Sequence, residues 1–265
     1  MVDLNALKAY ELIQFHTANG RVESYSFNEV LPVAHPINRG LGGRSFLVKN
    51  TQAQVSYFIK VLKANFYENT SFDDMVNLIE AASDAKITPN LIDHNSELGI
   101  LLFDGLPSEW EFCTVKDFRD KKVLKDAIKA LNKVHQTGLL KETKTVFDRI
   151  NKLKLELLKI SFHSHDNIFP ECYTMMDDYT EKIFELIEKR GFEKAPCKGE
   201  VNLSDFMLAD GDKIKLVDYD LASNSDAYSD LGYLANEVSR NEEDIKDISY
   251  LYTGKNNEYD LARLR

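Results

Sequence analysis

CKGEVNLSDFMLADGDKIKLVDYD, residues 197–220, is the most informative stretch of this sequence. The segments FML and IKLVDYD flank the turn ADGDK, and this order predicts two strands joined by a tight turn. Such a ribbon brings Asp205, at the start of one strand, close to Asp218, at the end of the other, with Glu200 on the loop that leads in. Gathered carboxylates repel each other unless a cation is present, and hard oxygen ligands suit Mg²⁺. The alternative interpretation is a polar hairpin whose acids point into water.

The N-terminal half contains a glycine-rich loop and a lysine within an apolar strand. The loop RGLGGRS (39–45) has glycines at 40, 42 and 43, which let backbone N–H groups approach a phosphate closely. Lys60 lies in YFIKVLK, and a lysine in such a strand is costly unless it is paired; here it could reach nucleotide phosphates. An ordinary hairpin turn and a lysine on the wet face of an edge strand are the alternatives.

The order of the predicted elements divides the chain into a β-rich half and a helical half. We expect strands within 39–50, 54–63 and 90–107 around a helix over 71–85 with Ser71 or Asp73 as its N-cap. The boundary, a candidate hinge at Phe103–Pro107, separates an N-terminal lobe (1–104) from a C-terminal lobe (105–265). Further helices are expected over the first 20 residues, 123–138 with Gly138 as its C-terminal cap, 145–160, 174–190 and 230–241.

His135 and Trp110 are the two further residues whose roles the sequence suggests. His135 closes the apolar face of the 123–138 helix, so we expect a packed, hydrogen-bonded histidine rather than a catalyst. Trp110, the only tryptophan, is either a core residue or the wall of a pocket for a cationic substrate.

Composition excludes several classes of protein. Of the 265 residues, 43% are hydrophobic and 29% charged, which is typical of a globular chain rather than a disordered one. The net charge of −10 argues against nucleic acid or an anionic membrane as the main partner. There is no apolar run of membrane-spanning length, and the first residues lack the pattern of a signal peptide. With three sparse cysteines, these features predict a cytoplasmic protein without disulfides; they leave the oligomeric state open.

Together the motifs resemble one family. LNKVHQTG and CKGEVNLSDFML…IKLVDYDLASNSDAYSDLGYLANE resemble motifs of the protein-kinase-like small-molecule phosphotransferases, the choline/ethanolamine kinases and aminoglycoside phosphotransferases. The resemblance covers roughly residues 35–240 and implies an α+β, two-lobed kinase-like fold that binds ATP and Mg²⁺. By position it makes Lys60 the phosphate-binding lysine, with Glu80 or Asp74 as its helix partner. ATP would lie under Gly40, Gly42 and Gly43 and against the hinge at Phe103 and Asp104.

The same resemblance assigns roles in the C-terminal half. Glu200 stands at the place of the catalytic base, Asp205 and Asp218 stand at the metal ligands, and Asp230 stands at a structural aspartate. The sequence departs from the family pattern at three points, because the motif histidine is Lys198, the base aspartate is Glu200 and the asparagine is Asp205. Lys198 is expected to pair with Glu200 or Asp205 and to replace metal charge there.

These observations favour an ATP- and Mg²⁺-dependent kinase that acts on the hydroxyl of a small molecule, with a cationic amino alcohol as one candidate. A catalytically degenerate kinase-like module that binds a nucleotide or a partner is the alternative. A weaker third option is transfer of a nucleotidyl group.

Overall fold

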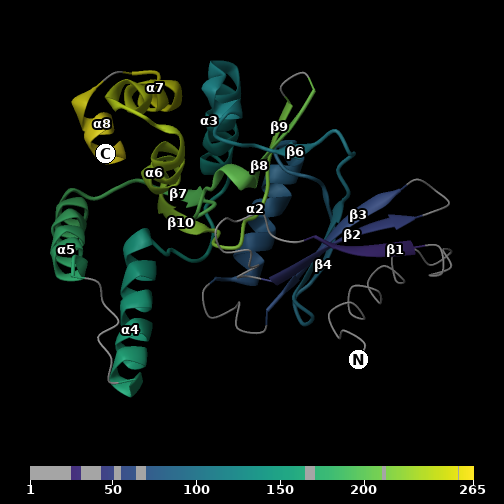
Figure 1. Ribbon diagram of the computed structural model, residues 1–265, viewed down its shortest axis with the longest axis horizontal. Coiled ribbons are helices and arrows are strands. Elements are labelled where there is room, and N and C mark those ends of the chain that lie inside the picture. The colour runs from purple at the N-terminus through teal and green to yellow at the C-terminus, as the bar shows by residue number, and fades with distance from the viewer. Residues whose placement is uncertain are drawn as a thin grey trace.

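The structure is a computed structural model that describes residues 25–30, 43–50, 55–63, 70–164, 171–210, 213–255 and 257–265. Within these ranges the fold is α+β, as predicted: an antiparallel sheet forms one side of the molecule and helices form the other (Figure 1). The expected helix over the first 20 residues, Gly40 and Gly42 lie outside the described residues.

The sheet has the order β1-β2-β3-β5-β4, and every neighbouring pair is antiparallel. Ile59 and Val61 in β3 are buried on one face, against side chains of β2 and β5. Alternation along the strand therefore turns Lys60 to the opposite face. The strands are β1 (Tyr25–Val30), β2 (Gly43–Asn50), β3 (Ser56–Leu62), β4 (Leu91–Asn95) and β5 (Ile100–Asp104).

Helix α2 (Phe72–Asp84) lies between the sheet and the helical part (Figure 1). Ser71 is its N-cap, as predicted: the backbone N–H of Asp74 donates to the Ser71 hydroxyl. Its buried face joins Leu62 and Leu101 of the sheet and side chains of α3 (Lys121–His135) and α6 (Ala227–Val238) in the main hydrophobic core. One continuous core thus ties the sheet to the helices.

The C-terminal part is mainly helical, with five short described strands in two small sheets. Strands β6 (Glu111–Phe112), β8 (Phe206–Ala209) and β9 (Lys213–Leu216) form one small sheet, and β7 (Lys194–Cys197) pairs with β10 (Ser223–Asp226). The remaining helices are α4 (Val146–Ser164), α5 (Tyr173–Arg190), α7 (Glu242–Thr253), α8 (Glu258–Leu264) and the 3₁₀ turns η3 (Asp117–Arg119) and η4 (Leu203–Asp205).

Three predicted boundaries are wrong. Helix α3 ends at His135, and its C-cap is Gln136 rather than Gly138, because the N–H of Gln136 already closes the last turn on Asn132 and Lys133. Strand β9 ends at Leu216, short of the predicted 220, because the chain turns into a left-handed conformation at Asp218. Helix α6 begins three residues earlier than predicted, at Ala227, where Asp226 caps it.

No helix in the described ranges is both long enough and apolar enough to cross a membrane.

Candidate functional site

The β8–β9 ribbon positions the predicted acids at one end of the small sheet. Phe206 pairs with Leu216, and the N–H of Val217 donates to the carbonyl of Asp205 at 2.7 Å. Asp205 and the loop containing Asp218 therefore lie side by side, as the sequence predicts. Asp218 has a φ of 64°, a left-handed conformation that is uncommon for a residue other than glycine. Such strain is often kept where a side chain must point in a required direction.

Lys60 reaches this loop from the sheet. Its Nζ lies 2.7 Å from Oδ1 of Asp218 and 2.6 Å from Oδ1 of Asp220. Burial alone would lower the pKa of Lys60, but the two carboxylates raise it above its ordinary value. Burial would likewise raise the pKa of Asp218, but the ammonium groups of Lys60 and Lys198 lower it. Burial raises the pKa of Asp220 to about 6, although Lys60 opposes the shift. Lys60 therefore joins the sheet to the acidic loop as a charged group.

Lys198 forms a second ion pair beside the first. Its Nζ donates to Oδ2 of Asp205 at 2.7 Å and to the carbonyl of Glu200 at 2.6 Å, and both side chains of the ion pair are buried. Burial alone would lower the pKa of Lys198, but Asp205 and Asp218 raise it. Burial raises the pKa of Asp205 to about 6, with Lys198 pulling in the opposite direction. The expected pairing of Lys198 is confirmed, with Asp205 as its charged partner.

Glu200 keeps its carboxylate free of the lysines. The residue is exposed, and from the described residues its Oε1 accepts only a long bond of 3.4 Å, from Nδ2 of Asn202. Asn202 was not singled out from the sequence, yet its N–H donates to Oδ2 of Asp205 at 2.7 Å and closes a reciprocal cap at the start of η4. Since Asn202 stands three residues before Asp205, the capping-box spacing was the available signal. The Glu200 carboxylate is thus placed to meet a group from solvent.

Asp230 holds the backbone of this loop from beneath. Its carboxylate is fully buried and accepts from the N–H groups of Lys198, at 2.8 Å, and Gly199, at 2.9 Å. His135 Nε2 lies 3.2 Å from the same carboxylate, and His135 Nδ1 lies 2.9 Å from the Tyr252 hydroxyl. His135 is therefore a packed, hydrogen-bonded residue, as predicted, and the contacts of Asp230 are those of a structural residue.

Arg149 is a positioning residue that sequence reasoning missed. From α4, it donates to the carbonyls of Gly199 and Leu221 and so links the loop of Glu200 to the loop that follows Asp218. Gly199 has a φ of 94°, and a Cβ there would lie 2.2 Å from the Leu221 carbonyl. An arginine on an amphipathic helix with many charges gives no sequence signal for this role.

The predicted helix partner of Lys60 is wrong. Asp74 is fully buried and accepts the N–H groups of Lys141 and Glu142, at 2.9 and 2.7 Å, while Glu80 is exposed. Lys60 instead forms ion pairs with Asp218 and Asp220, so both of its acidic partners come from the C-terminal half of the chain.

The described residues of the predicted nucleotide cleft lie along β2, β3 and β5. Gly43 begins β2, where a Cβ would lie 2.3 Å from the carbonyl of Val61. Phe103 packs against Phe58 with ring centroids 6.3 Å apart, and Asp104 bonds to Asn90 through its N–H and its carboxylate.

Trp110 belongs neither to the core nor to the acidic cluster. It is partly exposed, and the ammonium of Lys215 lies 5.9 Å from its ring centroid. This lysine already occupies a cation position over the indole.

The donor set at the ribbon fits a divalent cation. Asp205, Asp218 and Asp220 supply three carboxylates against the two ammonium groups of Lys60 and Lys198, so one negative charge is left over. Carboxylate oxygens are the ligands that Mg²⁺ prefers. The ligand atoms of His135, Cys197 and Asp230 also lie within 4.8 Å of one another, but His135 and Asp230 already bond to each other and to their neighbours.

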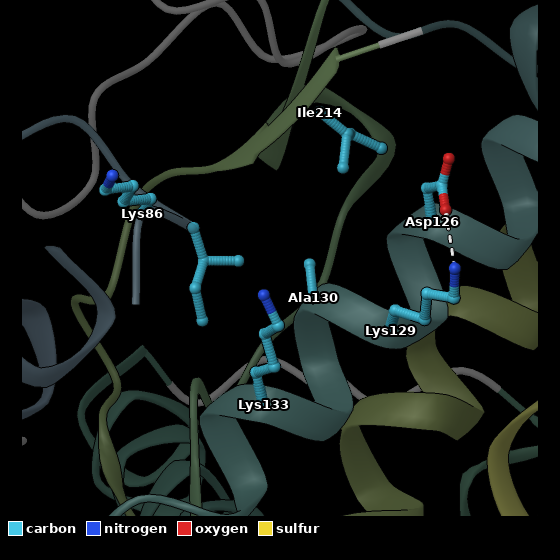
Figure 2. A pocket seen from close by; sticks show the side chains of 7 residues that line it. Lys86, Asp126, Lys129, Ala130, Lys133 and Ile214 are labelled. Atoms are coloured by element: carbon cyan, nitrogen blue, oxygen red, sulfur yellow. Dashed lines mark hydrogen bonds and ion pairs between the residues drawn. The ribbon is translucent and has the colours of Figure 1, made fainter. Parts of the chain in front are cut away.

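A separate hollow of about 300 Å³ lies against α3 and β9 (Figure 2). It contains none of the predicted site residues, and its three lysines are exposed. Its lining residues are Lys86, Ile87, Asp126, Lys129, Ala130, Lys133 and Ile214.

Known proteins resemble this chain in fold but not detectably in sequence. No protein-family model matches the chain, and no curated protein is significantly similar to it in sequence. Solved structures match over almost its whole length. A choline/ethanolamine kinase family protein from Mesorhizobium loti is 15% identical, with a TM-score of 0.72 over 98% of this chain and 80% of that one.

Two further structures agree with this match. Choline kinase LicA from Streptococcus pneumoniae, also solved with AMP, is 14% identical, with a TM-score of 0.73 over 97% of this chain and 85% of its own. Spectinomycin phosphotransferase APH(9)-Ia, in complex with ADP and spectinomycin, is 13% identical, with a TM-score of 0.61 over 97% of this chain and 83% of its own. The chain therefore has the two-lobed kinase-like fold that choline/ethanolamine kinases and aminoglycoside phosphotransferases share.

Proposed function

We propose that this protein is an ATP- and Mg²⁺-dependent phosphotransferase that acts on the hydroxyl of a small molecule. The observation that carries the proposal is the meeting of Lys60 with Asp218 and Asp220, next to the Lys198–Asp205 ion pair in the loop of Glu200. A strand lysine and loop acids from opposite halves of the chain converge there, on a fold shared with structures solved with AMP and ADP.

The proposal gives each lobe a task. The N-terminal lobe (1–104) would cover the phosphates with Gly40, Gly42 and Gly43 and hold them with Lys60, while Phe103 and Asp104 line the hinge beside the adenine. The C-terminal lobe (105–265) would supply the acids and the acceptor site. Lys60 would exchange a carboxylate partner for a phosphate oxygen when the nucleotide binds, since an ammonium group accepts either anion.

Catalysis would depend on position and charge. Asp205 and Asp218 would hold Mg²⁺, which neutralises phosphate charge when bound. Glu200 would orient the acceptor hydroxyl and accept its proton, because its carboxylate is exposed and unpaired with the neighbouring lysines. The acceptor would be an alcohol, with a cationic amino alcohol favoured by the net charge of −10. We place the protein in the cytoplasm.

The first test is a thermal melt with ATP, with and without Mg²⁺, followed by a screen of alcohol acceptors. A ligand that binds only the folded state raises the melting midpoint with the logarithm of its concentration. Asp218→Ala should reduce phosphotransfer by about 100-fold or more, the usual cost of losing an electrostatic contact to the transferred group. Phosphotransfer that survives this substitution would refute the proposal. The product mass distinguishes an added phosphate from an added nucleotidyl group.

A binding module without turnover is the second candidate. It is favoured by the two ion pairs, because Lys60 and Lys198 already occupy carboxylates that a catalyst would offer to metal. Turnover with any alcohol acceptor, abolished by Glu200→Ala, would end this alternative.

A further inference from the structure

Lys198 and Asp205 are two positions at which the sequence departs from the family it resembles, and the structure brings them into direct contact. The pair lies 2.7 Å apart, with 3% of the Lys198 side chain and 7% of the Asp205 side chain exposed. A histidine and an asparagine at these positions would form a neutral pair. The substitutions add one positive and one negative charge, so they leave the net charge of the pair unchanged.

The hydrogen bonds leave groups of both residues available. Oδ2 of Asp205 accepts from Lys198 Nζ and from the N–H of Asn202, whereas Oδ1 accepts no hydrogen bond from a described residue. An ammonium group has three donors, and Lys198 uses two of them on Asp205 and on the Glu200 carbonyl. Among the described residues nothing takes the third donor.

We propose that Lys198 is a resident cation of the nucleotide site, where it supplies positive charge that a divalent ion would otherwise provide. The inference rests on the proposed function and adds to it a reduced requirement for divalent ions. The third donor of Lys198 would bind a phosphate oxygen, and Asp205 would hold the ammonium in place. Lys198 is a compact point charge, so it serves this purpose better than an imidazole would.

A purely structural ion pair would behave differently. It would stabilise the fold with no dependence on added ions, and nucleotide binding would require Mg²⁺ whether or not Lys198 were present. The two interpretations therefore differ in how protein stability and ATP affinity respond to a divalent ion.

The first test needs no nucleotide. Lys198→Met keeps an unbranched side chain only one atom shorter than lysine and leaves Asp205 buried without a counter-charge, so its melting midpoint should fall. Adding Mg²⁺ or Mn²⁺ should recover most of this loss, while the same ions should change the wild-type midpoint little. Lys121→Met, which removes an exposed lysine paired with Asp247, is the control. Its melting midpoint should stay close to that of the wild type, and adding Mg²⁺ or Mn²⁺ should change it little. A Lys198→Met protein that melts lower and gains nothing from either ion would overturn the proposal.

The second test uses ATP and a variant without the buried charges. Lys198→Met combined with Asp205→Asn leaves no uncompensated charge, so it should fold even where the single variant does not. In the wild type, chelation of divalent ions should weaken ATP binding by less than about tenfold; in the double variant, it should weaken binding by well over tenfold.

The outcomes separate the two proposals. Equal dependence on the divalent ion in both proteins would refute the role of Lys198 while keeping the nucleotide site. If ATP raises the midpoint of neither protein, with or without Mg²⁺, the proposed function fails, and this inference fails with it.

Discussion

The three cysteine thiols differ in the access that water has to them. Cys113 and Cys197 are buried, while Cys172, beside the start of α5, is exposed. Burial, with the nearby charge of Asp117, raises the pKa of Cys113 to about 12. Burial also raises the pKa of Cys197 well above its ordinary value. The thiolate is the reactive form. Both buried thiols should therefore react slowly, because a reagent cannot reach them and because they remain protonated.

We therefore expect a thiol reagent at pH 8 to label Cys172 quickly in the folded protein and all three cysteines after denaturation. A time course of absorbance or mass measures the labelling. The Cys172→Ser variant should show almost no fast labelling. Fast modification of Cys197 in the folded protein would contradict the buried position of β7.

Single residues of the site were predicted unevenly. Asp205, Asp218 and Lys60 were found because a ribbon and an apolar strand fix their positions locally. The partners of Lys60 were missed because the choice between a helix acid and a loop acid depends on packing between distant segments. Arg149 was missed for the same reason, since two of its acceptors are backbone carbonyls 50 and 72 residues away and a third is the Ser223 hydroxyl.

At the scale of elements, α2 is fastened to the chain that follows α3. Asp74 accepts the N–H groups of Lys141 and Glu142, whereas its neighbour Asp73 is exposed and makes a 3.4 Å contact with the Lys141 ammonium. Asp74→Ala should lower the free energy of unfolding by about 2–4 kcal/mol, because two backbone N–H groups lose a charged acceptor whose side chain is fully buried. Asp73→Ala on the same helix is the matched control and should change stability little. Urea unfolding of both variants tests this; equal losses would show that the contacts of Asp74 do not stabilise the fold.

Strands β2 and β3 approach each other closely at Gly43. A Cβ at this position would lie 2.3 Å from the Val61 carbonyl, so Gly43→Ala must push the two strands apart. We expect a loss of about 1–3 kcal/mol in urea unfolding, typical of overpacking. Gly138→Ala is the control, since a Cβ there meets nothing within 4 Å and the residue is not in a left-handed conformation. It should be neutral or slightly stabilising, and a Gly43→Ala protein as stable as this control would contradict the packing at Gly43.

The existence of most elements could be predicted, but several of their ends could not. Hydrophobic periodicity identified α3 because eight of its residues are buried on one face. Its end at His135 depends on the N–H of Gln136, which closes the last turn on the carbonyls of Asn132 and Lys133, and hydrophobic periodicity does not report such backbone contacts. The end of β9 similarly depends on Asp218 turning toward Lys60.

At the scale of the whole molecule, Lys60 is an electrostatic link between the sheet and the helical part. It bonds to Asp218 and Asp220 across more than 150 residues of sequence. Lys60→Met would leave two adjacent carboxylates without this counter-charge. At pH 8 the free energy of unfolding should fall by about 2–4 kcal/mol, somewhat less than for a fully buried pair because Asp218 is partly exposed.

The size of this loss should depend on pH. Burial raises the pKa of Asp220 to about 6, above its value in the unfolded chain, so the stability that Asp220 contributes is present at low pH and is lost as the pH rises through 6. Without Lys60 the pKa should rise further, and protonation at pH 5 would relieve the repulsion from Asp218. We therefore expect a smaller loss at pH 5 than at pH 8 in urea unfolding of Lys60→Met. Lys121→Met, which removes an exposed ion pair between α3 and α7, should show no such difference. A loss for Lys60→Met that is independent of pH would mean that the two acids do not repel each other in the folded protein.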